Sequence, residues 1–197
     1  MEERKNIAVF AAGQDGIEGK FKGVAYKIGE LAAQNGFNLI NGSGFGLMEE
    51  TAKGAKDAGG YVIAVGLQKL EEKNEYIDKY YERIGIHSRQ STLIALSDAF
   101  IAVPGGLGTL YEITEIIELK KLGEEEPEPI IIINSYGFYN GLRMQLDEMR
   151  KNEYIKDAYS KYVVFVDTPE EAINMIKSFY SDTDAVDSIS PIIPPSS

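Results

Sequence analysis

The sequence contains no cysteine, a single histidine and no long apolar run. Without cysteine, disulfides and thiolate chemistry are excluded. One histidine leaves carboxylates as the strong side-chain metal ligands, so we expect no metal and no metal-dependent catalysis. A membrane helix needs about 20 consecutive apolar residues. No run of the chain approaches that length, and we expect no membrane association.

Positive charge is also scarce, since 20 Lys and Arg residues face 31 Asp and Glu residues and the formal net charge is −11. This balance argues against nucleic-acid binding, because phosphate backbones are held mainly by clustered Lys and Arg. It leaves a small anion possible, since amides at a helix start can hold one phosphate whatever the net charge. The N-terminal residues are charged and lead directly into a strand-like run, so we expect a cytoplasmic protein.

The composition otherwise fits one folded domain. Of the 197 residues, 44% are hydrophobic, which is enough for a substantial core. We expect a single Rossmann-like domain over residues 1–180. Residues 181–197 are rich in Ser, Asp and Pro and are expected to form a disordered tail.

Short apolar runs alternate along the chain with longer segments of helical periodicity. Most of the runs are continuous rather than alternating in polarity, which suits strands covered on both faces. The alternation predicts an α/β fold with a doubly wound, mostly parallel, Rossmann-like sheet and helices on both faces. The predicted strands are 7–11, 37–40, 61–65, 84–86, 100–103, 130–133 and 162–166, and the predicted helices are 21–33, 47–58, 91–97, 110–122, 138–150 and 170–180.

Three of the predicted strands are followed by glycine-rich turns, which we call the first turn (residues 11–16), the second turn (41–46) and the third turn (104–108). In a doubly wound fold such turns meet at the carboxyl edge of the sheet, where ligands bind. None of them matches the G-x-G-x-x-G fingerprint or the P-loop. The sequence therefore indicates neither a dinucleotide-binding domain of the usual type nor a P-loop NTPase.

The third turn opens the segment PGGLGTLYE, which runs from Pro104 to Glu112. Its glycines free the main chain just before a predicted helix, so exposed amides, the positive helix end and the Thr109 hydroxyl can form an anion site. A structural interpretation is equally open. Thr109 and Glu112 have the spacing of a capping box, in which Glu112 only bonds the backbone of Thr109.

The same segment resembles the PGGxGTxxE motif of the LOG family, the cytokinin riboside 5′-monophosphate phosphoribohydrolases that are often mislabelled lysine decarboxylases. The similarity covers residues 7–176 and includes GLM at 46–48, the segment HSRQSTLIALSDAFIAVPGG around Arg89, and GFYN at 137–140. The resemblance implies that Arg89 and Glu112 form the catalytic pair. It also implies a ligand site with the 5′-phosphate on the third turn, and the predicted ligand-binding residues are Gly105, Gly106, Gly108, Thr109, Glu115, Gly44 and Met48.

The implied reaction is hydrolysis of the N-glycosidic bond of a nucleoside 5′-monophosphate, which gives free base and ribose 5-phosphate without a cofactor. Breaking this bond builds positive charge on the anomeric carbon, which a carboxylate such as Glu112 can stabilise while it orients the attacking water. Arg89 offers a permanently charged planar fork to an anion. The resemblance further implies a homodimer or a higher homo-oligomer.

The chain departs from the family pattern near this site. The family has Arg-Lys where this chain has Arg89-Gln90, and GLMG where it has GLME, ending in Glu49. Loss of a positive charge and gain of a negative one would lower anion affinity if both residues face the phosphate. These departures keep an alternative open, a non-catalytic nucleotide or molybdenum-cofactor binding or carrier protein. We expect His87 to have a surface or packing role, and Tyr139 to be structural.

Overall fold

The computed structural model describes residues 4–68, 73–123, 129–155 and 159–181. Within these ranges the chain forms one seven-stranded sheet in the order β4-β3-β2-β1-β5-β6-β7, and every neighbouring pair is parallel. The strands are β1 (Asn6–Phe10), β2 (Asn38–Asn41), β3 (Val62–Leu67), β4 (Lys79–Arg83), β5 (Ala99–Ala102), β6 (Ile130–Ile133) and β7 (Val164–Val166).

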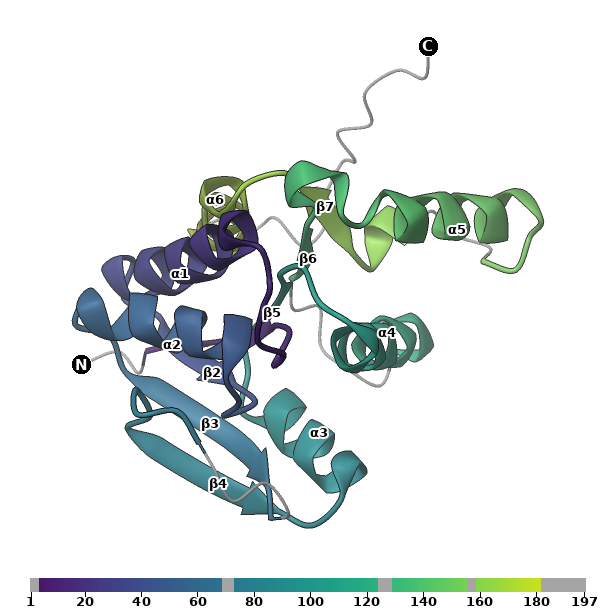
Figure 1. Ribbon diagram of the computed structural model, residues 1–197. Coiled ribbons are helices and arrows are strands. Elements are labelled where there is room, and N and C mark those ends of the chain that lie inside the picture. Colours follow the sequence, from purple (N-terminus) through teal and green to yellow (C-terminus); the bar gives the residue numbers. More distant parts are fainter. Residues whose placement is uncertain (1–3, 69–72, 124–128, 156–158, 182–197) are drawn as a thin grey trace.

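Helices cover both faces of the sheet, as Figure 1 shows. One layer contains α1 (Gly19–Gln34), α2 (Gly46–Asp57) and α6 (Pro169–Ser181), and the other contains α3 (Ile86–Ala95), α4 (Leu107–Leu122) and α5 (Asn140–Lys151). Alternate residues of each strand point to opposite faces. Thus Ile7 and Val9 pack in the core under the first layer, whereas Ala8 and Phe10 pack in the core under the second. The predicted fold class is confirmed.

The strand order reverses between β1 and β5, which lie side by side at the middle of the sheet. Doubly wound sheets bind ligands in the crevice outside the carboxyl ends of the strands at this switch point. The first turn follows β1 and the third turn follows β5. The fold therefore places two of the three glycine-rich turns on either side of the expected crevice.

Residue assignments differ from the sequence prediction in one region. The predicted strand at 84–86 is wrong, because the strand is β4 and Gly85, with φ of 81°, caps α3, which begins at Ile86. The predicted helix at 91–97 consequently begins five residues earlier. His87 and Arg89 lie on this helix rather than in the turn before it.

The helices α1 and α2 approach each other through glycines. A Cβ at Gly29 would lie 1.9 Å from the carbonyl oxygen of Thr51, and one at Gly54 would lie 2.0 Å from the carbonyl oxygen of Tyr26. Only glycine allows this backbone-to-backbone contact. This contact therefore holds α1, which follows the first turn, directly against α2, which follows the second turn.

The remaining expectations concern membranes and the chain terminus. None of the helices within the described ranges combines the length and the apolar character needed to cross a membrane. The last helix continues to Ser181, and the predicted tail from residue 182 onward lies outside the described residues. The single-domain assignment for residues 1–180 stays a prediction.

Candidate active site

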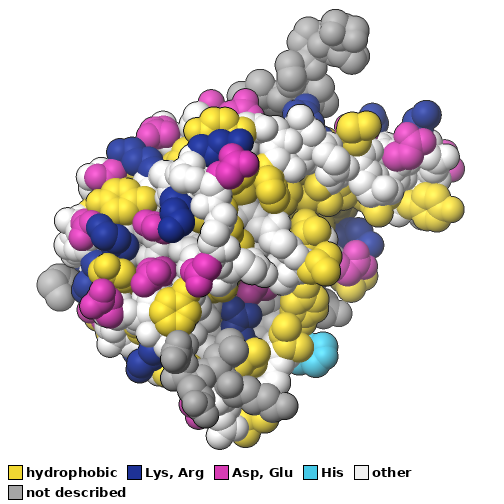
Figure 2. Space-filling view, viewed as in Figure 1, with side chains coloured by type: hydrophobic (Ala, Val, Ile, Leu, Met, Phe, Trp, Pro, Cys, Tyr) yellow, Lys and Arg dark blue, Asp and Glu magenta, His cyan; other side chains and the backbone are white. Residues whose placement is uncertain are grey.

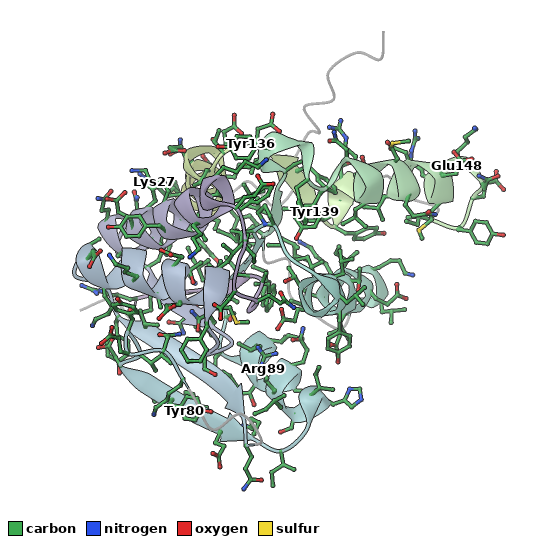
Figure 3. The ribbon with its side chains drawn as sticks, viewed as in Figure 1. Lys27, Tyr80, Arg89, Tyr136, Tyr139 and Glu148 are labelled. Carbon is green, nitrogen blue, oxygen red and sulfur yellow. The ribbon has the colours of Figure 1, made fainter. Side chains whose placement is uncertain are left out.

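Arg89 is held in a fixed orientation at the carboxyl edge of the sheet. Its side chain comes from α3, and the residue is only 8% exposed. The Nε atom donates to the main-chain carbonyl of Val65 at 2.9 Å, and Nη1 donates to Oε1 of Glu112 at 2.8 Å. In Figure 3 the guanidinium lies between α2, α3 and α4, and in the same view Figure 2 shows a basic and an acidic group together in the middle of this face.

Glu112 is the partner of Arg89 and lies on α4, where it is 7% exposed. Burial raises the pKa of its carboxyl group, and the charge and hydrogen bond of Arg89 oppose this rise. The helix begins at Leu107 with Gly106 as its N-cap, and no side chain caps it. The capping-box interpretation of Thr109 and Glu112 is therefore wrong, because Glu112 is bonded across to α3.

The amides of the third turn form the opposite side of the site. Within the described part of the chain, the amides of residues 106–109 donate no hydrogen bond, and the first turn of α4 carries no acidic residue. Unpaired amides at a positive helix end are the usual components of an anion site. A Cβ at Gly105 would lie 2.2 Å from Oγ1 of Thr109, so Thr109 packs directly against the turn.

The second turn and the start of α2 contribute Gly44 and Met48, which are also predicted to bind ligand. A Cβ at Gly42 would lie 2.0 Å from Nη2 of Arg89, so the guanidinium rests on the main chain of this turn. The Met48 side chain packs over the same glycines, with its methyl carbon 2.8 Å from a Cβ placed at Gly13 and 3.1 Å from one placed at Gly44. Met48 and Arg89 thus both pack against Gly42 in the second turn, and the ligand-binding roles of Gly44 and Met48 stay predictions.

Gln90 occupies the position where the family pattern has lysine. It is fully buried, and its Nε2 donates to the main-chain carbonyl of Glu112 at 3.0 Å. Its Oε1 is buried and has no hydrogen-bond partner among the described residues. Gln90 therefore packs between α3 and α4, and this neutral amide lies immediately behind the Arg89–Glu112 pair.

Glu115 lies on α4 three residues after Glu112, and its buried Oε2 has no hydrogen-bond partner among the described residues. Burial raises the pKa of the Tyr111 hydroxyl, and a hydrogen bond with Glu115 raises it further. The same hydroxyl lies 3.4 Å from Nδ1 of His87, which is exposed as expected. The predicted ligand-binding role of Glu115 stays a prediction.

The sequence interpretation missed two contributors to the site. Val65 acts through its main-chain carbonyl, which no residue pattern reveals. Tyr139 donates from its hydroxyl to the carbonyl of Val103 at 2.8 Å, and so it contacts the third turn. The similarity at residues 137–140 marked this segment, but it gave no reason to connect Tyr139 with the turn. No cluster of three or more His, Asp or Glu residues that could hold a metal is found in the described ranges.

Comparison with known proteins supports the same family. The sequence pattern of the family described as "possible lysine decarboxylase" matches residues 48–176, more than half of the chain. The probable cytokinin riboside 5′-monophosphate phosphoribohydrolase LOGL6 of Oryza sativa subsp. japonica is 30% identical over 92% of this chain and 74% of its own length. The cytokinin riboside 5′-monophosphate phosphoribohydrolase LOG3 of Arabidopsis thaliana is 27% identical over 89% of this chain and 83% of its own.

Solved structures show the same fold at lower identity. The molybdenum cofactor binding protein of Rippkaea orientalis matches with a TM-score of 0.72 and 24% identity, over 91% of this chain and 99% of its own. The molybdenum cofactor carrier protein of Chlamydomonas reinhardtii matches with a TM-score of 0.71 and 21% identity, over 91% and 100%. These likenesses concern the fold alone. The chain contains the PGGLGTLYE segment, and both the sequence pattern of the family and the relatives match most of its length. The chain therefore belongs to the LOG family.

Proposed function

We propose that the protein is a phosphoribohydrolase that cleaves a nucleoside 5′-monophosphate into free base and ribose 5-phosphate. The observation that carries the proposal is the buried Arg89–Glu112 pair beside the unpaired amides of the third turn. Relatives named as cytokinin riboside 5′-monophosphate phosphoribohydrolases support the same reaction class.

In this mechanism the 5′-phosphate binds the amides of residues 106–109, which carry partial positive charge. The ribose then extends toward Glu112. As the bond between C1′ and the base nitrogen breaks, its electron pair leaves with the base, which takes up the proton that the attacking water loses when its oxygen bonds to C1′. The Glu112 carboxylate stabilises the positive charge that develops on C1′ and orients the water whose oxygen bonds to this carbon.

Arg89 has a supporting part in this scheme. Its bonds to Val65 and Glu112 fix the carboxylate, and they use two of the five N–H donors of the guanidinium. The remaining donors are available to the sugar phosphate. Because Arg stays charged at all working pH values, Glu112 retains a cationic neighbour throughout the reaction.

The proposal is tested by incubating the protein with AMP and with isopentenyladenosine 5′-monophosphate and following base release by chromatography. We expect base and ribose 5-phosphate in equal amounts, with no loss of activity in excess EDTA. The matched variants are Glu112→Gln and Glu115→Gln on the same helix. If neither nucleotide is cleaved, or if Glu112→Gln cleaves as fast as the wild type, the enzymatic proposal is wrong.

The proposed assembly is a homodimer or a larger homo-oligomer built on the layer that contains α3, α4 and α5. Figure 2 shows hydrophobic side chains running along this side of the molecule, from α5 toward α3. Strongly exposed hydrophobic residues on the helices of this layer include Leu107 at 86%, Leu122 at 60% and Met144 at 71%. Large exposed apolar patches mark association surfaces. Sedimentation should give a mass above that of one chain. Met144→Glu should lower this mass, whereas Tyr61→Glu, at the residue directly before β3, should leave it unchanged.

A second candidate is a carrier that binds a nucleotide or a molybdenum cofactor without turnover. The observation that favours it is Gln90, a buried neutral side chain where the family pattern has lysine. This candidate predicts tight binding of a phosphorylated ligand with no product. It also predicts that Gln90→Lys introduces base release, whereas turnover by the wild type rules it out.

A further inference from the structure

Tyr139 places a buried hydroxyl inside the third turn. The residue comes just before α5, is 3% exposed, and reaches the neighbouring strand-to-helix connection after β5. Its hydroxyl donates to the carbonyl of Val103 at 2.8 Å. This bond fixes the carbonyl directly before Pro104, whose own φ is restricted by its ring.

The other end of Tyr139 is fixed as firmly. Its main-chain amide donates to Oδ1 of Asn134 at 2.6 Å, and Nδ2 of Asn134 donates to Oδ1 of Asn140 at 2.9 Å. The chain reaches this position through two left-handed residues, Tyr136 with φ of 59° and Gly137 with φ of 70°. A non-glycine residue in that region is uncommon and is maintained by the surrounding structure.

The hydroxyl also remains protonated under all ordinary conditions. Burial raises the pKa of Tyr139 far above its usual value, the Gly105 amide lowers it in part, and the charge of Glu112 raises it again. A protonated hydroxyl can donate to the Val103 carbonyl. Figure 3 places Tyr139 beside α4, between that helix and α5.

We propose that Tyr139 is a positioning residue for the anion site of the third turn. Its hydrogen bond holds the Val103 carbonyl directly before the third turn, while the amides of residues 106–109 have no partner in the described residues. The turn is thereby fixed with these four amides free for a ligand. This inference rests on the proposed function only in naming the ligand as a sugar phosphate, because the same geometry would hold inorganic phosphate.

The first test is made on the wild-type protein by amide hydrogen exchange. We expect the amides of Gly106 and Gly108 to exchange rapidly without ligand. Inorganic phosphate or ribose 5-phosphate should then protect both amides. If neither anion protects the third turn, the inference is overturned.

The second test compares Tyr139→Phe with Tyr159→Phe, which removes a hydroxyl from the same layer of the molecule. Loss of the Tyr139 hydroxyl leaves the buried Val103 carbonyl without this partner and loosens the third turn, so we expect the Kd for ribose 5-phosphate and the KM for the nucleotide to rise about tenfold or more. The kcat should stay near that of the wild type, because a uniform loss of binding changes KM alone. Equal Kd values for Tyr139→Phe and the wild type would overturn the inference.

The two proposals fail in different ways. A wild type that binds ribose 5-phosphate but releases no base removes the phosphoribohydrolase proposal and leaves the Tyr139 inference standing if the Tyr139→Phe affinity falls. A wild type that releases base while Tyr139→Phe keeps the same KM removes only the inference. Should Tyr139→Phe not fold, the hydrogen-exchange result on the wild type decides.

Discussion

The second and third turns have similar sequences, yet their amides have different partners. In the second turn, the amides of Leu47 and Met48 at the start of α2 both donate to the carbonyl of Ala12, at 2.9 and 3.3 Å. The N-terminal helical turn of α2 also carries Glu49, whose negative charge is favourable at the positive end of the helix. In the third turn, the corresponding amides of α4 have neither acceptor nor acidic neighbour in the described residues.

The two turns also differ in how far other residues bury them. Asn74 is buried over the second turn, where its Nδ2 donates to the carbonyls of Ser43 and Gly44 at 3.2 and 2.9 Å. The third turn is open, since Gly106 and Gly108 are exposed. We infer that the second turn is a structural wall that supports Arg89 and Met48, and that the third turn receives the anion. Glycine content alone does not distinguish these two uses.

The sharpest way to test this assignment is to remove the carboxylate beside the third turn. Glu112→Gln should lower kcat for base release by about 10² to 10⁴-fold, the usual contribution of a catalytic acid or base. Binding of ribose 5-phosphate should persist, because the amides of residues 106–109 are untouched. Steady-state kinetics with Glu115→Gln as the control measures both effects, and a similar loss in that control would contradict a special role for Glu112.

A smaller effect is expected from crowding the third turn itself. In Gly105→Ala the new Cβ meets Thr109 at 2.2 Å, so the first turn of α4 must shift. We expect the affinity for ribose 5-phosphate, measured by calorimetry, to fall about tenfold or more, or about 1.4 kcal/mol. Gly141→Ala on α5 is the matched control, because nothing lies within 4 Å of its Cβ. An unchanged affinity in Gly105→Ala would place the anion elsewhere.

Crowding the second turn should instead affect the fold. In Gly46→Ala the Cβ would lie 2.4 Å from the carbonyl oxygen of Gln14, at a residue with φ of 60°. We expect the free energy of unfolding to fall by about 1–3 kcal/mol. Urea denaturation measures this, with Gly23→Ala on α1 as the control at an uncrowded position. If Gly46→Ala keeps full stability and loses only ligand affinity, the second turn is a binding element after all.

The smallest expected effect is a displacement of the pH profile. Burial raises the pKa of Glu112, so this carboxyl is protonated, and inactive as a carboxylate, up to a higher pH than an ordinary glutamate. The acid limb of kcat/KM should therefore have its midpoint above about 4.3, the unperturbed value for Glu. Activity rises with pH through this limb. A midpoint at or below the unperturbed value would show that Glu112 is not the titrating group.

Much of this architecture could be predicted because the parallel strands are continuous apolar runs, such as the four isoleucines of β6. The edge strand β4 escaped detection because its residues, KYYER, are exposed or half-buried and form no apolar run. Residues 84–86 were wrongly predicted as a strand because they form a short apolar run, and such a run does not distinguish a strand from the start of a helix.

The site was predictable only where local sequence determines it. The glycines of the third turn and the helix behind them follow from neighbouring residues. The choice between a capping box and an ion pair for Glu112 did not, because Arg89 is brought to it from another helix. Residue spacing could not predict the hydrogen bond of Tyr139 either, because its hydroxyl reaches Val103 only through the pairing of β5 with β6.

The glycine contact between α1 and α2 has a mechanical consequence for this site. Where two helices touch through their main chains, no side chain can change rotamer to let one helix slide past the other. The first and second turns, each attached to one of these helices, are therefore held at a fixed spacing. We expect any change in the width of the crevice to come from the opposite layer, which carries α3, α4 and α5.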